Sequence, residues 1–350
     1  MTWLTRGALA SGRRARGLLL LRPDGGPAIP MDAADRAAAR ELAAAVLTAA
    51  GVGEDDRVVV ALNSDGEPAG TLVAEAAATV AEAAASVGPR GRMRLHTALE
   101  GTGATTLVAT PTGAMDFLAR LHLEFLIDPL DLELRRVLLV GEVASPNTAA
   151  QLASEFGAAV RELYADPFFG VPLAWRDPSD PVLTPVRDGL LALAHLEKDV
   201  PLSPPYAQEL GELVVTPRWH SSLGACTLRT GQVARLDGVG EGVPMPAHTT
   251  GDHVLVRGRW IPVPRVAAAL ARIDGVGHWE LRISREGTLD AAALHVTFTR
   301  ETLVGNPMWK ARIVQALYSI TPVRIEVVVE PQTTEERRPG TVTDLRGHHL

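Results

Sequence analysis

Glycine clusters are the first residues in this sequence whose type and spacing suggest chemistry. Two of them, Gly101-x-Gly103 and Gly238-x-Gly240-x-Gly242, have the composition of phosphate-binding loops. Such loops need a strand before the glycines and a helix after them, so that backbone N–H groups converge on the phosphate. Neither cluster has that context. Gly101 and Gly103 come before a predicted strand, so we interpret them as the end of a helix.

Histidines are the candidate metal ligands. His220, His248 and His253 could gather with Asp252 around an ion, but their spacing matches no compact ligand motif. Histidines in loops are commonly solvated. We therefore predict solvated loop histidines and no metal site.

Candidate nucleophiles also lack a recognisable setting. No serine stands in a Gly-x-Ser-x-Gly elbow, including the four that lie near predicted loops, Ser11, Ser64, Ser145 and Ser221. The single cysteine, Cys226, excludes an intrachain disulfide and any multi-cysteine metal site. Its apolar surroundings predict a place in the core of a strand. Hydrolase chemistry therefore has no positive support.

Composition bounds the class of protein. The chain has 350 residues, 46% hydrophobic and 21% charged, which suffices for two domains with substantial cores. The net charge of −7 disfavours nonspecific attraction to nucleic acid or to an anionic membrane. A basic cluster, Arg13, Arg14 and Arg16, is short, and composition alone favours a solvated turn over a phosphate clamp.

Localisation follows from the same composition. No uninterrupted apolar run approaches the roughly 18 residues of a membrane span. The run Leu18–Leu21 is too short for the core of a signal peptide and is followed at once by Arg22. With one cysteine, these features predict a soluble, unprocessed, cytoplasmic protein with no nucleic-acid or membrane partner.

From about residue 35 to 245, predicted helices and strands alternate, which is typical of an α/β domain. A capping serine, Ser145, and a proline at the first helical position, Pro146, mark one helix start clearly. The predicted helices are 37–50, 74–86, 112–121 and 146–156, and the predicted strands are 57–62, 105–109, 136–140, 160–163 and 211–216. We expect a Pro-rich loop over 177–205.

A domain boundary is predicted between residues 238 and 250, where Gly, Pro and His replace periodic patterns. Beyond it, the predicted strands are 253–257, 260–263, 279–284, 294–298 and 324–329, and the predicted helices are 264–273 and 307–319. This order fits two helices on one face of a small antiparallel sheet. The predicted parts are therefore a large α/β domain (1–248), a small α+β domain (249–331) and a polar, mobile tail (332–350).

Three segments, taken in order, resemble the phenylacetate–CoA ligases of the adenylate-forming superfamily. They are Gly211–Thr216, Arg229-Thr230-Gly231, and Val256-Arg257-Gly258 with Pro262 shortly after. Further matches are Ala109-Thr110-Pro111, Gly141-Glu142, Tyr164 at the place of the adenine-stacking tyrosine, and 326–331. The resemblance runs from about residue 10 to 346. It implies a large α/β domain of the ligase type and a small mobile C-terminal α+β domain that moves about a hinge.

The residues that the family uses for chemistry are the ones that differ. Ser11 and Gly12 begin a phosphate loop, but Arg13 and Arg14 stand in place of hydroxyl residues. Because Ser11 comes so early, the family's preceding N-terminal part is nearly absent. The resemblance then implies either that a partner covers the exposed sheet or that the fold closes differently, and an uncovered edge would favour a homodimer.

The metal and ribose positions differ as well. Phe168 stands where the family has a glutamate that positions Mg²⁺, and a phenyl ring cannot coordinate a cation. Asp166, two residues earlier, could substitute only in a rebuilt loop. Gln232 replaces the aspartate that holds the ribose hydroxyls, which implies weaker nucleotide binding.

The hinge and the catalytic lysine also differ. Thr249 replaces the nucleotide-contacting arginine of the hinge pattern, and Gly251 and Asp252 remain as hinge candidates. Thr341 stands at the loosely aligned place of the family's catalytic lysine. Lys310 lies in a predicted helix and is a poor replacement.

The resemblance thus implies nucleotide-binding candidates at Ser11, Gly12, Arg13, Arg14, Gly141, Glu142, Tyr164 and Gln232. No catalytic residue is assigned. The leading hypothesis is a protein whose ATP-dependent adenylation is lost or altered and which binds a carboxylic acid, an acyl conjugate or a partner. ATP, AMP and Mg²⁺ would bind weakly, CoA stays a candidate, and no tightly bound cofactor is expected. The alternatives are an active AMP-forming acid ligase or acyltransferase, and a non-catalytic assembly subunit, which could be a homodimer.

Overall fold

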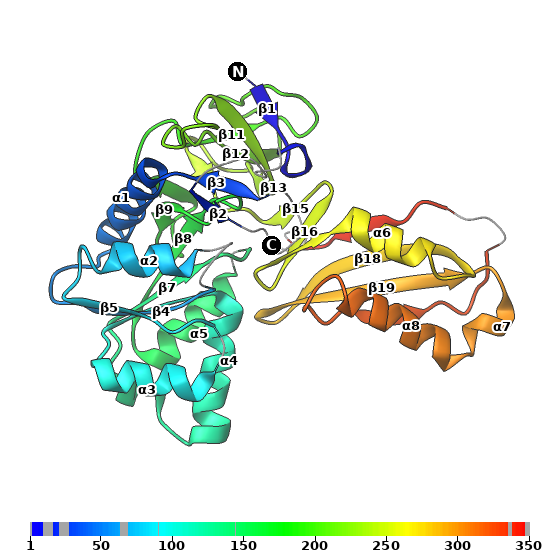
Figure 1. The fold of residues 1–350 in the computed structure, drawn as a ribbon, viewed down its shortest axis with the longest axis horizontal. Helices are drawn as coiled ribbons and strands as arrows, with labels where there is room; N and C mark the ends of the chain where they lie inside the picture. The colour runs from blue at the N-terminus through cyan, green and yellow to red at the C-terminus, as the bar shows by residue number, and fades with distance from the viewer. Residues whose placement is uncertain are drawn as a thin grey trace. The chain divides into compact units, whose positions relative to one another are not determined.

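The structure is a computed structural model that describes residues 2–9, 17–20, 28–63, 69–89, 91–143, 145–334 and 338–346. The chain divides into two compact units, Met1–Pro246 and Ala247–Leu350, called unit 1 and unit 2 below (Figure 1). Within the described ranges, no helix combines the length and the apolar character needed to cross a membrane.

The larger sheet of unit 1 has eight strands in the order β14-β10-β9-β8-β7-β6-β4-β5. Its parallel part contains β5 (Ala83–Ser86), β4 (Arg57–Ala61), β6 (Thr106–Ala109), β7 (Arg136–Val140) and β8 (Ala159–Ala165). Three antiparallel strands complete it, β9 (Pro172–Arg176), β10 (Val182–Pro185) and β14 (Val243–Pro244).

Helices cover both faces of this sheet, as continuous apolar strands require. In β4, Val58 and Val60 pack toward α1 (Ala33–Ala49) and α2 (Gly70–Ala77). The alternate residues Val59 and Ala61 pack toward α3 (Arg92–Thr102), α4 (Pro111–Arg120) and α5 (Pro146–Phe156). Figure 1 shows the two helix groups on opposite sides of the strands. Two short helical segments follow α4, η2 (Leu121–Phe125) and η3 (Pro129–Leu132).

Local capping chemistry sets the helix starts. Ser145 Oγ accepts a hydrogen bond from the N–H of Thr148 at 3.4 Å, and Pro146 occupies the first turn of α5. Thr110 caps α4 in the same way through the N–H of Gly113 at 3.0 Å. The predicted helix 146–156 is confirmed, as is a helix end at Gly103, whose φ of 57° lies in the left-handed region.

The second sheet of unit 1 contains β1, β13, β12 and β11 in that order. Their bounds are β1 (Thr2–Leu4), β13 (Cys226–Arg235), β12 (Leu210–Val215) and β11 (Leu191–Ala194). Beside them lie η1 (Arg6–Ala8) and the paired strands β2 (Leu18–Leu20) and β3 (Ile29–Met31). One apolar cluster joins β8, β9 and β10 of the larger sheet to β11, β12 and β13. The candidate site lies along this junction.

Unit 2 has a four-stranded sheet in the order β20-β19-β18-β21. β18 (Val276–Glu286) and β19 (Leu289–Phe298) form an antiparallel hairpin, flanked by β20 (Glu326–Val329) and β21 (Thr341–Asp344), each parallel to its neighbour. A second hairpin joins β16 (His253–Val256) and β17 (Arg259–Pro262). The remaining elements are β15 (His248–Thr249), α6 (Val263–Ala271), α7 (Glu301–Val304) and α8 (Pro307–Tyr318).

Several predicted elements are wrong in unit 1. The predicted helix 74–86 ends at Ala77, and Ala83–Ser86 forms β5, because pairing with β4 outweighs the helix propensity of alanine. The expected loop 177–205 contains β10 and β11. Cys226, expected in a strand core, begins β13 and is only half-buried.

Two expectations for unit 2 are also corrected. Its sheet is mixed, because β20 and β21 run parallel to the hairpin strands that they flank. The tail after Pro331, expected to be mobile, returns to the sheet as β21. β21 pairs residue by residue with β18, from Glu280 opposite Thr341 to Ile283 opposite Asp344.

Candidate functional site

Tyr164 at the end of β8 and Gln232 in β13 are brought together between the two sheets of unit 1. The Tyr164 hydroxyl donates to Oε1 of Gln232 at 2.8 Å. Only 3% of Tyr164 and 5% of Gln232 is exposed. Burial raises the pKa of Tyr164 above its ordinary value, so the phenol stays a neutral donor. The two residues that the resemblance assigns to adenine and ribose therefore satisfy each other.

The strand around Gln232 is fixed by buried polar groups. Glu212 accepts from the N–H of Gly231 at 2.9 Å and pairs with the guanidinium of Arg229. Thr230 Oγ1 donates to the carbonyl of Leu213 at 2.7 Å and accepts from the N–H of Gln232 at 3.1 Å. Burial raises the pKa of Glu212, against the opposing effect of Arg229. Gln232 is thus held on a strand that resists local rearrangement.

The turn after β8 points Phe168 into the core. Asp166 Oδ1 accepts from the N–H groups of Phe168 at 2.9 Å and Phe169 at 2.8 Å, which closes the turn. Both phenyl rings are 1% exposed and belong to the apolar cluster between the sheets. At the position where the resembling ligases have a metal-positioning glutamate, this chain therefore places a buried hydrocarbon ring.

Asp166 is a buried carboxyl with an unusual titration. It is 1% exposed, and its Oδ2 accepts no hydrogen bond from any residue that the structure describes. Burial raises its pKa to about 7, against the N–H groups of Phe169, Phe168 and Val171 and the charge of Arg6. A carboxyl that takes up and releases a proton near neutral pH is a candidate functional group.

Arg6 comes from the start of the chain to this turn. Its two terminal nitrogens each donate to the carbonyl of Pro167 at 2.8 Å. The guanidinium carbon lies 5.6 Å from the centre of the Phe168 ring, and the residue is 4% exposed. Sequence analysis missed Arg6, because no local pattern links it to residues 161 positions away.

Gly141 and Glu142 lie where β7 ends. Gly141 has a φ of 88°, which favours glycine. The Glu142 carboxylate accepts from the N–H of Thr112 at 3.0 Å and from its hydroxyl at 2.8 Å, which ties the end of β7 to the start of α4. This is the carboxyl edge of the parallel strands, where open α/β sheets bind ligands.

The predicted phosphate-loop residues Ser11, Gly12, Arg13 and Arg14 lie outside the described residues. Their assignment to phosphate remains a prediction.

The predicted hinge segment is connected to the end of the chain inside unit 2. The N–H and the hydroxyl of Thr249 both donate to Asp344 at 3.0 Å. Arg346, 2% exposed, bridges Asp344 and Asp290 with contacts of 2.6 Å to each. Gly251 is exposed with a φ of 85°, and nothing lies within 4 Å of a Cβ built on it. Asp252 accepts the N–H of Val263 through its carbonyl at 2.9 Å.

The Thr249, Asp290, Asp344 and Arg346 network was missed by sequence analysis. Only the short spacing of Asp344 and Arg346 hints at it, since the other members are distant in sequence. Although burial raises the pKa of Asp344, hydrogen bonds and charge from Arg346 lower it below its ordinary value overall.

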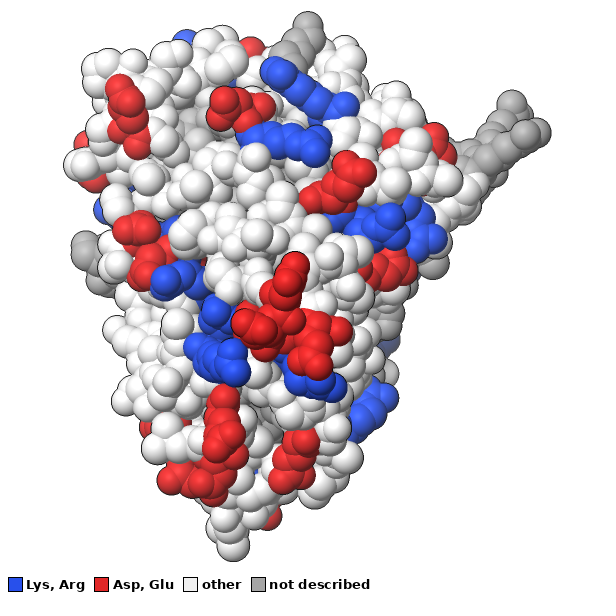
Figure 2. All heavy atoms as spheres, turned by 90° about the vertical axis from the view of Figure 1, so that its left-hand side faces the viewer, with Lys and Arg blue, Asp and Glu red and all other residues white. Residues whose placement is uncertain are grey.

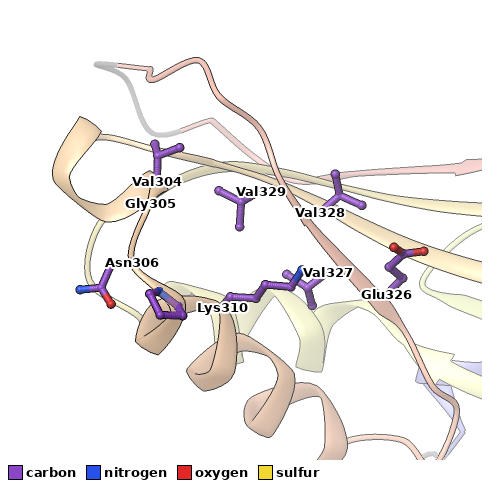
Figure 3. Close-up of a pocket in the computed structure, with 9 residues that line it drawn as sticks. Val304, Gly305, Asn306, Lys310, Glu326, Val327, Val328 and Val329 are labelled. Atoms are coloured by element: carbon purple, nitrogen blue, oxygen red, sulfur yellow. The ribbon is translucent and has the colours of Figure 1, made fainter.

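Thr341 and Lys310 lie at opposite edges of the unit 2 sheet. Thr341 begins β21, which pairs with β18. Lys310, an exposed residue of α8, lines a pocket beside β20 at the other edge (Figure 3). The structure therefore does not bring Lys310 to the place that the resemblance gives to the catalytic lysine.

His220 is not the solvated loop histidine that we predicted, because it is 2% exposed. Its Nε2 lies 2.8 Å from the carbonyl of Pro30, and its Nδ1 accepts from the N–H groups of Ser222 and Leu223 at 3.2 Å. The carboxylate of Asp35 lies 3.8 Å away. His220 thus fixes a turn. In the parts of the chain that the structure describes, no group of three or more His, Cys, Asp and Glu residues could hold a metal ion.

Charges are mixed on the side of unit 1 that lies on the left in Figure 1, where α1, α2, β5 and α3 are seen. Figure 2 shows Lys and Arg side chains interspersed with Asp and Glu across it. Arg36 of α1 pairs with Glu75 of α2 at 3.2 Å, and Arg57 pairs with Glu82 at 2.7 Å. This face therefore lacks the broad basic field that attracts nucleic acid.

No protein-family model matches the sequence, and no curated protein matches it. Solved structures do. A 2-hydroxyisobutyryl-CoA ligase in complex with 2-HIB-AMP and CoA has a TM-score of 0.71 and 19% identity, over 91% of this chain and 71% of that one. A malonyl-CoA ligase with methylmalonyl-CoA and AMP bound has a TM-score of 0.60 and 15% identity, over 93% and 72%.

The amide bond synthetase McbA from Marinactinospora thermotolerans has a TM-score of 0.63 and 17% identity, over 89% of this chain and 64% of that one. At such low identities the likeness shows the fold alone. The predicted fold class is confirmed: this chain has the fold of the adenylate-forming acyl–CoA ligases.

Proposed function

We propose that this protein keeps the ligase fold but does not adenylate an acid with ATP, and that it binds a carboxylic acid or an acyl conjugate such as an acyl-CoA. The observation that carries this proposal is the buried hydrogen bond between Tyr164 and Gln232. The two residues that the resemblance assigns to adenine and ribose are instead bonded to each other in the interior.

The energetic cost of reopening this pair supports the proposal. A nucleotide that stacks on Tyr164 needs a ring that is now only 3% exposed, and a ribose that bonds to Gln232 has to take it from the Tyr164 hydroxyl, which leaves a buried polar atom without its partner. Each such atom costs about 1–3 kcal/mol, which corresponds to a loss of roughly tenfold to a hundredfold in affinity. Because Thr230 and Glu212 hold the strand of Gln232, this cost is not relieved by a small shift of the backbone.

Phe168 supports the loss of adenylation independently. Pyrophosphate release needs a cation against the developing charge, and carboxylate oxygens are the ligands that Mg²⁺ prefers. The buried ring of Phe168 supplies none, and the adjacent cation is Arg6, which is already bonded to the carbonyl of Pro167.

Phenylacetate–CoA ligases resemble this chain in sequence pattern and are the subtype that we assign.

Acyl conjugates are the proposed ligands because the solved neighbours are complexes with an acyl adenylate, CoA or an acyl-CoA. The experiment is a pair of thermal-shift titrations of the full chain, one with MgATP and one with a panel of acyl- and aryl-CoA esters. We expect millimolar MgATP to leave the Tm unchanged and at least one ester to raise it. A concentration-dependent rise with MgATP would favour an active ligase instead. Unchanged Tm values with all ligands would favour the assembly subunit.

A further inference from the structure

β20 is an edge strand of the unit 2 sheet. It pairs with β19 on one side, and within the described ranges no other strand pairs with its second side. Open edges of this kind are templates for pairing with another chain, and proteins usually blunt them with proline, charges or a covering element. The β20 residues Glu326, Val327, Val328 and Val329 contain no proline and three consecutive valines.

The backbone groups that face the open side can be identified from the register. The N–H of Glu330 donates to the carbonyl of Val296 in β19 at 2.9 Å. Because backbone groups alternate sides along a strand, residues 326 and 328 also bond to β19, and Val327 and Val329 direct their N–H and C=O groups outward. No described residue donates to or accepts from these outward groups.

A pocket of about 430 Å³ lies beside this edge. Its lining consists of Val304, Gly305, Asn306, Pro307 and Lys310, together with the four residues of β20. Figure 3 shows the Lys310 side chain extending from α8 toward Val327. Helix α8 therefore lies beside the edge strand β20 and leaves space next to the β20 backbone.

Residues of opposite charge flank the three valines of β20, so that two antiparallel copies of this segment complement each other. Arg324, exposed, and Glu330, partly exposed, lie on either side of β20 and on the same face as Glu326. Glu330 also contacts His295 Nδ1 at 2.7 Å. In an antiparallel pair of two β20 strands with Val327 opposite Val327, Arg324 of each copy lies opposite Glu330 of the other. An alternative register, with Val327 opposite Val329, puts Glu326 opposite Glu330, and like charges directly opposite are destabilising.

We propose that β20 pairs with β20 of a second copy of this chain, antiparallel and with Val327 opposite Val327. The two four-stranded sheets then form one continuous sheet across a two-fold axis. Val327 of each copy exchanges both of its backbone hydrogen bonds with Val327 of the other. This interface lies entirely on unit 2 and does not depend on the nucleotide-site residues of unit 1.

Sedimentation velocity of the full chain across the micromolar range tests the interface. We expect a concentration-dependent dimer. Arg324→Glu should raise its dissociation constant at least tenfold by opposing Glu330 with a like charge, and the swap Arg324→Glu with Glu330→Arg should restore it. Val327→Pro should abolish the dimer while removing no donor to β19, since the N–H that it removes points outward.

The control is Arg300→Glu, the same charge change at an exposed arginine of unit 2 that pairs with Asp274 in the connection between α6 and β18. It should leave the dimer unchanged. A wild-type chain that stays monomeric, or a dimer indifferent to both Arg324→Glu and Val327→Pro, overturns the proposal. Should Val327→Pro fail to fold, the charge swap decides alone, because both of its substitutions are on the surface.

Discussion

The hydroxyl of Tyr164 and the side-chain carbonyl of Gln232 are joined by a 2.8 Å hydrogen bond between two sheets, 68 residues apart in the sequence. Both residues are buried. The side chains that the resemblance assigns to nucleotide binding therefore join the two sheets of unit 1 in the interior.

Removing the hydroxyl with Tyr164→Phe should lower the free energy of unfolding by about 1–3 kcal/mol, because Gln232 Oε1 is left buried without its donor. The double variant Tyr164→Phe with Gln232→Leu should lose less than the sum of the two single losses. Urea denaturation measures all three. The matched control is Tyr206→Phe, whose hydroxyl bonds the carbonyl of Gly242 at an exposed position and should cost less. Additive losses would show that Tyr164 and Gln232 are not coupled.

Phe168→Ala should lower the free energy of unfolding by about 3–5 kcal/mol, because a fully buried ring is replaced by a cavity. Leu123→Ala, at a side chain that is 79% exposed, is the control and should change it by less than about 0.5 kcal/mol. Similar values for the two variants would place Phe168 outside the core.

Asp166 gives a prediction about pH. Its pKa is raised by burial from 3.8 to about 7, so between these values the folded protein binds more protons than the unfolded chain. The stability contributed by this group therefore falls as pH rises through the window, by at most about 1.4 kcal/mol per unit, and levels off above it.

Asp166→Asn removes this titration while keeping a carbonyl for the N–H groups of Phe168 and Phe169. The variant should gain stability relative to the wild type between pH 4 and pH 7, measured by urea denaturation at several pH values. Parallel stability curves for the two proteins would contradict the assignment.

Arg346→Met should destabilise unit 2 by about 3–5 kcal/mol, because Asp344 is then buried without its cation and Asp290 keeps only its pairing with Arg285. Calorimetry should show the loss in one unfolding transition and not in the other. The control Arg282→Met removes an exposed arginine that pairs with Glu280, and it should have little effect.

Local signals in the sequence predicted the elements whose ends are set by capping residues. Ser145 and Pro146 set the start of α5, and its bounds were predicted correctly. The segment Ala83–Ser86 was predicted as helix, because only the neighbouring strand β4 makes it a strand. Strands β10 and β11 were missed for the same reason, since antiparallel pairing and not local pattern defines them.

The candidate site, like the fold, could be predicted from the sequence only in part. Resemblance singled out Tyr164, Gln232 and Phe168, but it did not show that the first two bond each other or that the third is core. Arg6 lies 161 residues from Pro167, and Thr249 lies 95 residues from Asp344. No periodicity or motif spans such distances, so these contacts depend on the folded chain.

The most direct test of the central claim is acid-dependent release of pyrophosphate from ATP, with Mg²⁺, CoA and a broad panel of alkyl and aryl acids. An active 2-hydroxyisobutyryl-CoA ligase with its own acid serves as the control for the assay. Our account predicts no release above the acid-free background for any member of the panel. Turnover near a typical enzymatic rate of about 10 s⁻¹ with any acid would contradict it.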